Sequence, residues 1–122
     1  MTSESSAQAA VRLAASQAGA RLWRNNVGAG KLANGSYLRW GLANDSTAVN
    51  RSIKSGDLIG IRPVLITPAH VGMTLGRFVS REIKPPGWRY HPNDEHEQAQ
   101  QRWADLVNSL GGDARFSTGE WI

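Results

Sequence analysis

The chain of 122 residues contains no cysteine, so it can form neither a disulfide framework nor a thiolate metal site. It also has no apolar run approaching the roughly 20 residues that a membrane-spanning helix needs. Residues 1–6 lack the basic stretch and apolar core of a secretory signal peptide. These absences predict a soluble, intracellular (cytoplasmic) protein with no membrane partner, folded as a single domain over residues 1–122.

Positive charge is concentrated in the first two thirds of the chain. Residues 1–81 carry ten Lys and Arg against three acids, whereas residues 82–122 carry four against seven. Eleven of the 14 cations are arginines, which suit bidentate contacts to phosphate. A basic surface with a few embedded carboxylates suits a nuclease, because the cations hold the polyanion and the carboxylates hold a metal. Charge alone leaves open the alternative of a merely basic soluble protein.

Apolar periodicity and turn residues predict a mixed α/β order of elements. Helices are expected at residues 3–18 and 94–110, and strands at 20–25, 36–40, 58–61, 76–83 and 114–116, with 64–67 as a continuation of the third strand. The glycine-rich segment 27–35 is expected to be a turn or mobile loop, and 41–56 to be irregular. The apolar stripe of the second helix is predicted to consist of Ala99, Trp103, Leu106, Val107 and Leu110.

Glu82, Ile83 and Lys84 form an E-x-K triplet at the end of an expected strand, 25 residues after Asp57. Residues i and i+2 of a strand face the same side, so Glu82 and Lys84 should point into one site and Ile83 into the core. If the strand that follows Asp57 is a neighbour, Asp57 and Glu82 can share a metal. Phosphodiester hydrolysis uses carboxylates that hold hard divalent metals and a cation near the attacking water. The alternative for the triplet alone is an ordinary surface ion pair.

Four stretches of the chain carry a more specific pattern than the triplet. They are Trp23-Arg24-Asn25-Asn26-Val27-Gly28, Ser55-Gly56-Asp57-Leu58-Ile59-Gly60, Glu82-Ile83-Lys84 with Pro86-Gly87 after it, and Gln100-Gln101-Arg102-Trp103. Together they resemble the virus-type replication-repair nuclease (VRR-NUC) family of the PD-(D/E)XK nuclease superfamily, in its small stand-alone phage or bacterial form. The resemblance extends from Glu4 to about Phe116. The family often has a proline before the aspartate where this chain has Gly56, and a glycine can make the same turn.

The resemblance implies an α/β fold with a restriction-endonuclease-like core, in which helices flank a mixed central β-sheet. It implies that Asp57 and Glu82 bind Mg²⁺ or Mn²⁺ with the backbone carbonyl of Ile83, and that Lys84 orients or activates the attacking water. Glu4 would match the acidic residue of the family's first helix, and Gln100 the glutamine that supports the site from the second long helix.

Spacing supports these last two roles only in part. Glu4 and Gln8 share a helix face with Val11, which would aim both polar groups inward, although a capping glutamate beside a solvated glutamine is the alternative. Gln100 lies in line with Trp103 and Val107, whereas Gln98 and Gln101 lie off that stripe. The aromatic residues and histidines after the triplet can be read either as site residues or as packing and exposed loop residues: Trp88, Tyr90, His91 and His96.

The expected function is a metal-dependent endonuclease that acts on branched DNA, such as a Holliday junction or a flap, during replication, repair or recombination. The candidates for phosphate contacts are Arg24, Lys31, Arg39, Arg51 and Lys54. A homodimer is expected because two cuts in a branched substrate need two sites related by symmetry, and a helicase or replisome component is a conceivable partner. The alternatives are a non-specific or restriction-like DNase, and a DNA-binding module whose nuclease site is inactive.

Overall fold

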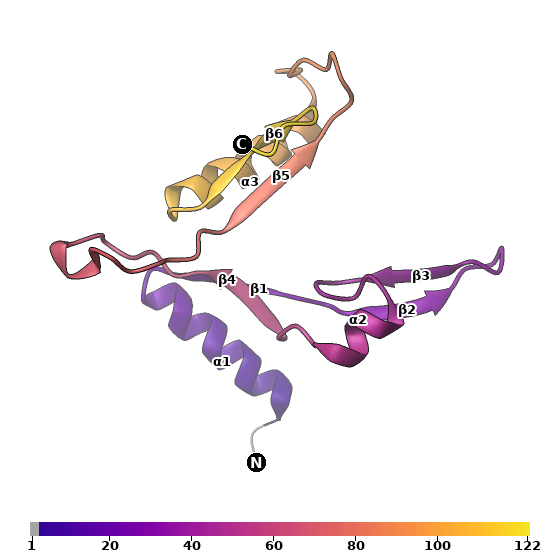
Figure 1. Cartoon of the computed structure of the whole chain (residues 1–122), viewed down its shortest axis with the longest axis horizontal. Helices are drawn as coiled ribbons and strands as arrows, with labels where there is room; N and C mark the ends of the chain where they lie inside the picture. The colour runs from indigo at the N-terminus through magenta and orange to yellow at the C-terminus, as the bar shows by residue number, and fades with distance from the viewer. Residues whose placement is uncertain (1–2) are drawn as a thin grey trace. The chain divides into compact units, whose positions relative to one another are not determined.

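The computed structural model describes residues 3–122, in two compact units, Met1–Gly60 and Ile61–Ile122. Within these residues the chain is a mixed α/β protein whose strands form three two-stranded sheets (Figure 1). No helix within residues 3–122 has the length and apolar character needed to cross a membrane. The single domain expected from chain length stays a prediction.

The first unit pairs β1 with β4 and β2 with β3. The second pairing is an antiparallel hairpin in which Gly28 lies opposite Trp40 and Lys31 opposite Tyr37. Figure 1 shows α2 beside the open end of this hairpin. The elements are α1 (Glu4–Gln17), β1 (Arg21–Arg24), β2 (Gly28–Lys31), β3 (Tyr37–Trp40), α2 (Thr47–Ser52) and β4 (Leu58–Ile61).

Three predictions for segments 27–67 were wrong. Gly28–Lys31 is a strand and not a loop, because β3 supplies a complete antiparallel partner that overrides the low strand propensity of glycine. Segment 41–56 contains α2, which begins where the Ser46 hydroxyl accepts a hydrogen bond from the Val49 amide. Segment 64–67 forms no strand, because it is flanked by prolines, which lack the amide proton that a strand ladder requires.

The second unit places β5 parallel to β6, and α3 connects them as the crossover that a parallel pair requires. Figure 1 shows α3 against one face of this pair. The Trp103 indole donates to the Ser80 hydroxyl at 2.9 Å, and Val107 is fully buried. The elements are η1 (Pro68–His70), β5 (Val79–Ile83), α3 (Glu95–Ser109) and β6 (Asp113–Ser117).

The core of this unit differs from the predicted one at two places. Ala99 of the expected apolar stripe is exposed, whereas Glu97 and Ala104 of α3 are buried. Ile83 does not point into the core, since it is 66% exposed. The reason is strand alternation: Glu82 lines the interface with α3, so Ile83 projects from the opposite face.

Arg81 joins the two strands of the second unit. Its guanidinium donates to the Asp113 carboxylate at 2.8 Å and to the Asp113 backbone carbonyl at 2.8 Å. Arg115 donates to the other carboxylate oxygen at 3.0 Å. Hydrogen bonds from Arg81 and then Arg115 lower the pKa of Asp113 from 3.8 to about 2. The Arg81 side chain is only 9% exposed, so this pair fixes the register of β5 on β6.

Replacing Asp113 with Asn should therefore lower the melting temperature in a pH-dependent way. A carboxylate whose pKa is depressed stabilises the folded state above its unfolded pKa, and this stabilisation is lost as the pH falls through the folded pKa. The difference between wild type and Asp113→Asn should be complete above pH 4 and should shrink as the pH falls from 3.8 towards about 2. Thermal unfolding from pH 2 to 7 measures this difference in melting temperature, with the exposed Asp45→Asn as the control. A difference that does not change with pH would contradict the lowered pKa of Asp113.

Candidate active site

Glu82 and Lys84 lie on the face of β5 that α3 covers. The Lys84 amide donates to the Ser117 carbonyl at 2.9 Å, so the pairing with β6 continues one residue beyond the end of β5. This extended backbone keeps the alternation of side chains, and Glu82 and Lys84 therefore project to the same side. Glu82 and Gln100 line the same narrow space between β5 and α3.

The Lys84 ammonium is held in one position by its neighbours. It donates to Oε1 of Gln100 at 2.9 Å and lies 3.9 Å from Oε1 of Glu82. The rings of Trp88 and Phe116 flank it, with centroids 5.6 and 5.8 Å away. The Lys84 side chain is 14% exposed, whereas Glu82 is 45% exposed. The site thus presents an accessible carboxylate beside a cation that has little freedom to move.

Among the three glutamines of α3, only Gln100 contacts the E-x-K triplet within the described residues. Gln98 donates to the Pro92 carbonyl, and Gln101 donates to Asp105. The amide of Gln100 accepts from Lys84, which makes it a positioning group for that ammonium. The position of Gln100 in the apolar stripe of α3 is the sequence feature that separates it from its neighbours.

The loop after β5 is packed against α3 and β6. The ring of Trp88 lies 4.7 Å from that of Phe116, and Tyr90 contacts both rings. The buried Glu97 accepts from the His91 backbone at 2.8 Å and pairs with the His91 imidazole at 2.9 Å. Burial raises the pKa of Glu97, but hydrogen bonds from His91 and Trp88 outweigh it and lower the pKa below its usual value. Glu97, which the sequence reasoning did not single out, therefore fixes this loop.

Asp57 lies in the first unit, in a turn that Asn25 clamps. The backbone amide of Asn25 donates a hydrogen bond to the Asp57 carbonyl at 2.9 Å. The Asn25 side chain donates to the Ser55 hydroxyl at 2.7 Å and to the Gly56 carbonyl at 2.9 Å, and it accepts from the Leu42 amide at 3.3 Å. One asparagine thus ties β1 to three consecutive residues that end at Asp57. The sequence motif that contains Asn25 does not by itself indicate this role.

Asp57 also borders a polar hollow of about 390 Å³ in the first unit. Asn44, Asn50 and Lys54 contribute to its wall. Asn44 is 3% exposed and donates to the carbonyls of Gly28 and Trp40 at 2.7 and 2.9 Å. The hollow therefore combines a carboxylate, an ammonium group and amides, which suits a polar ligand better than an apolar one.

The other predicted residues also lie in the first unit. Glu4 is the first residue of α1 and is exposed. The expectation that Val11 makes an apolar contact beside it is wrong, since Val11 is 51% exposed; this face of α1 has no cover in the described unit. Arg39 is held by Asn44 and Thr47. The remaining candidates for phosphate contacts are exposed: Arg24, Lys31, Arg51 and Lys54.

The oxygen donors of these residues fit a hard divalent cation. Glu82 presents a half-exposed carboxylate and Asp57 an exposed one, and oxygen ligands are those that Mg²⁺ and Mn²⁺ prefer. Within residues 3–122, no group of three or more His, Cys, Asp and Glu side chains could hold a metal ion.

The chain matches none of the protein-family models, curated proteins or solved structures with which it was compared.

Asn25→Ala should loosen the turn that carries Asp57. The Leu42 amide loses its acceptor, and a hydrogen bond is worth about 1 kcal/mol, so its hydrogen exchange should accelerate roughly fivefold. Hydrogen–deuterium exchange followed by NMR measures this effect. Asn26→Ala, at the exposed neighbouring position, is the matched control and should leave Leu42 unchanged. Equal exchange in both variants would show that the Asn25 side chain does not hold the turn.

Proposed function

We propose that this chain is a metal-dependent DNA endonuclease that hydrolyses phosphodiester bonds in branched DNA. In this proposal the chain has a restriction-endonuclease-like core of the VRR-NUC type, with a mixed central β-sheet. Asp57, Glu82 and the Ile83 carbonyl hold Mg²⁺ or Mn²⁺, and Glu4 adds to this acidic site.

The observation that carries the proposal is the position of the Lys84 ammonium. A lysine that serves only as a surface ion pair is exposed and mobile, whereas Lys84 is 14% exposed and is fixed by Gln100 at 2.9 Å. A fixed cation next to a carboxylate can stabilise the negative charge that develops on a phosphate without first reorganising. The partial exposure of Glu82 leaves room for a substrate phosphate on its other side.

Each residue then has a stated task. Glu82 and Asp57 supply negative charge and oxygen ligands, Lys84 orients the attacking water, and Gln100 holds Lys84. A divalent metal, when bound, polarises the phosphate and makes water a stronger nucleophile. The cations of residues 24–54 hold the DNA backbone, so binding should weaken steeply with salt.

The choice of branched DNA follows from the family resemblance. Cutting both strands of a branch requires two sites, and we propose a symmetric homodimer. A helicase or replisome component that directs the enzyme to its substrate is part of the same proposal.

The test is a cleavage assay on four-way junction, flap, single-stranded and linear duplex DNA with Mg²⁺ or Mn²⁺. Asp57→Ala and Glu82→Ala should abolish cleavage, because each removes a proposed metal ligand. Both variants should retain DNA binding, because losing an acid does not weaken the attraction between the protein's cations and the DNA phosphates. Lys84→Ala should lower the rate by about 100- to 1,000-fold, the scale of a lost transition-state contact. Glu95→Ala, an exposed acid of α3, is the control and should cleave normally.

Two outcomes would contradict the nuclease proposal, and a third would reject only its selectivity for branches. Cleavage by Glu82→Ala at the wild-type rate would show that Glu82 does not hold the catalytic metal. Binding of all four DNAs by the wild type without cutting, in either metal, would indicate a DNA-binding module. Equal rates on duplex and branched DNA would retain the nuclease and reject its selectivity for branches.

A further inference from the structure

The chain turns back on itself directly after the E-x-K triplet. The Trp88 amide donates to the Pro85 carbonyl at 3.1 Å, and Gly87 has a φ of 82°. A type II turn favours proline at its second position and needs a positive φ, hence glycine, at its third. The sequence Pro85-Pro86-Gly87 therefore brings Trp88 back beside Lys84, whose ammonium nitrogen lies 5.6 Å from the centroid of the indole.

The indole of Trp88 lies between two charged side chains. The ammonium of Lys84 lies over its ring, and its Nε1–H donates to Oε2 of Glu97 at 3.4 Å. The π face of an indole attracts a cation, and its N–H is a hydrogen-bond donor that suits an anion. Phenylalanine would offer the face without the donor. Tryptophan is thus the residue that can contact both of these groups at once.

Aromatic packing alone does not explain this cluster. The rings of Trp88, Tyr90 and Phe116 contact one another, and such contacts are enough to hold a loop. Two charged groups nevertheless lie against these rings: the Lys84 side chain is 14% exposed, and Glu97 is 7% exposed. Burying a charge costs free energy that an apolar residue would not cost. The cluster therefore points to a role beyond packing.

The surroundings of the Lys84 ammonium restrict where it can point. It donates to Gln100 at 2.9 Å. The rings of Trp88 and Phe116 form one aromatic wall beside it, because their centroids are 4.7 Å apart and both lie within 5.8 Å of the ammonium nitrogen. Aromatic rings attract a cation more strongly where water is excluded. The wall and the hydrogen bond together keep the ammonium beside Glu82, whose side chain is 45% exposed.

We propose that Trp88 is a positioning residue for the reaction and that Glu97 holds Trp88 in place. Trp88 acts through Lys84, since it keeps the ammonium beside Glu82, where the proposed function places the substrate phosphate. The inference rests on that function and deepens it by adding the loop after β5. A cation already in place stabilises the transition state without reorganisation. Loss of the indole should therefore lower kcat and leave KM nearly unchanged.

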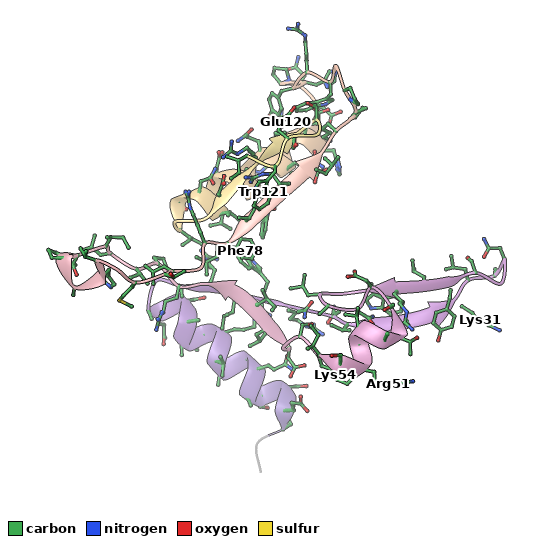
Figure 2. All side chains as sticks on the ribbon, viewed as in Figure 1. Lys31, Arg51, Lys54, Phe78, Glu120 and Trp121 are labelled. Carbon is green, nitrogen blue, oxygen red and sulfur yellow. The ribbon has the colours of Figure 1, made fainter. Side chains whose placement is uncertain are left out.

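The first measurement uses the free protein and needs no cleavage. Ring currents of Trp88 and Phe116 should shift the NMR signals of the Lys84 ε-methylene away from those of Lys31, which is exposed on the β2–β3 hairpin (Figure 2). Trp88→Ala should move the Lys84 signals towards the Lys31 position, and Trp88→Phe should retain much of the shift. Trp121→Ala, at an exposed tryptophan of the same unit, is the control and should leave the Lys84 signals unchanged.

A double-mutant cycle tests whether Glu97 acts through the indole. Glu97→Gln keeps the size of the side chain and removes the charge that receives the Trp88 N–H, so it should also move the Lys84 signals. In a Trp88→Phe background, which has no N–H to donate, Glu97→Gln should have little further effect, because the two positions act on one contact. His91→Ala removes only the imidazole partner of Glu97, and it should leave the Lys84 signals unchanged.

The second measurement is the rate of cleavage of flap and junction DNA. Trp88→Ala should lower kcat roughly tenfold, the scale of a cation–π contact shielded from water, and Trp88→Phe should recover most of this loss. Unchanged Lys84 signals in Trp88→Ala, or a loss confined to KM, would overturn the inference and leave Trp88 with a packing role.

Failure of the inference is distinguishable from failure of the proposed function. Cleavage by the wild type and by Trp88→Ala with equal kcat would reject the positioning role of Trp88 and retain the nuclease. A wild type that cuts none of the DNAs would reject the proposed function, and with it the task of Trp88, even if the Lys84 signals show the contact with the ring.

Discussion

The hydrogen bond between Lys84 and Gln100 is the interaction on which the candidate site depends. It joins the end of β5 to α3 and holds an ammonium group beside Glu82. Its formation requires β5 to remain extended through Lys84, which the pairing with β6 provides. The Arg81–Asp113 pair secures that register, and Glu97 secures the loop that carries Trp88 against the same ammonium. The second unit is therefore arranged so that a largely buried cation lies beside a half-exposed carboxylate.

The first unit applies the same principle to a second carboxylate. Asn25 fixes the turn from Ser55 to Asp57 with its backbone and its side chain, and Asn44 joins the open end of the β2–β3 hairpin to the hollow beside Asp57. Hydrogen bonds from polar side chains to the backbone fix these turns, because they give hydrogen-bond partners to backbone N–H and C=O groups that lie outside helices and strands. In both units the amide side chains position the charged ones.

Periodicity alone predicted α1, α3, β3, β4 and β6 to within about a residue or two at most ends, because each has a clear cap, a stop or an alternating pattern. It failed at β2 and α2, where the signal lies outside the segment: β2 needs β3 as a partner, and α2 needs Ser46 as a cap. The face shared by Glu82 and Lys84 follows from strand geometry, and the choice of Gln100 follows from helix spacing. Asn25 and Glu97 could not be assigned roles, because their contacts lie across turns that single-chain patterns do not specify.

One measurement tests the proposed metal site directly: whether Asp57 and Glu82 bind the same ion. Mn²⁺ added to isotopically labelled protein broadens the NMR signals of nuclei close to the ion. If both carboxylates hold one ion, as proposed, the backbone signals of residues 57 and 82 should broaden together with one midpoint, and Glu82→Ala should shift the midpoint for Asp57 to higher Mn²⁺. Broadening at only one of the two residues, or a response at Asp57 that is unaffected by Glu82→Ala, would contradict a shared metal site.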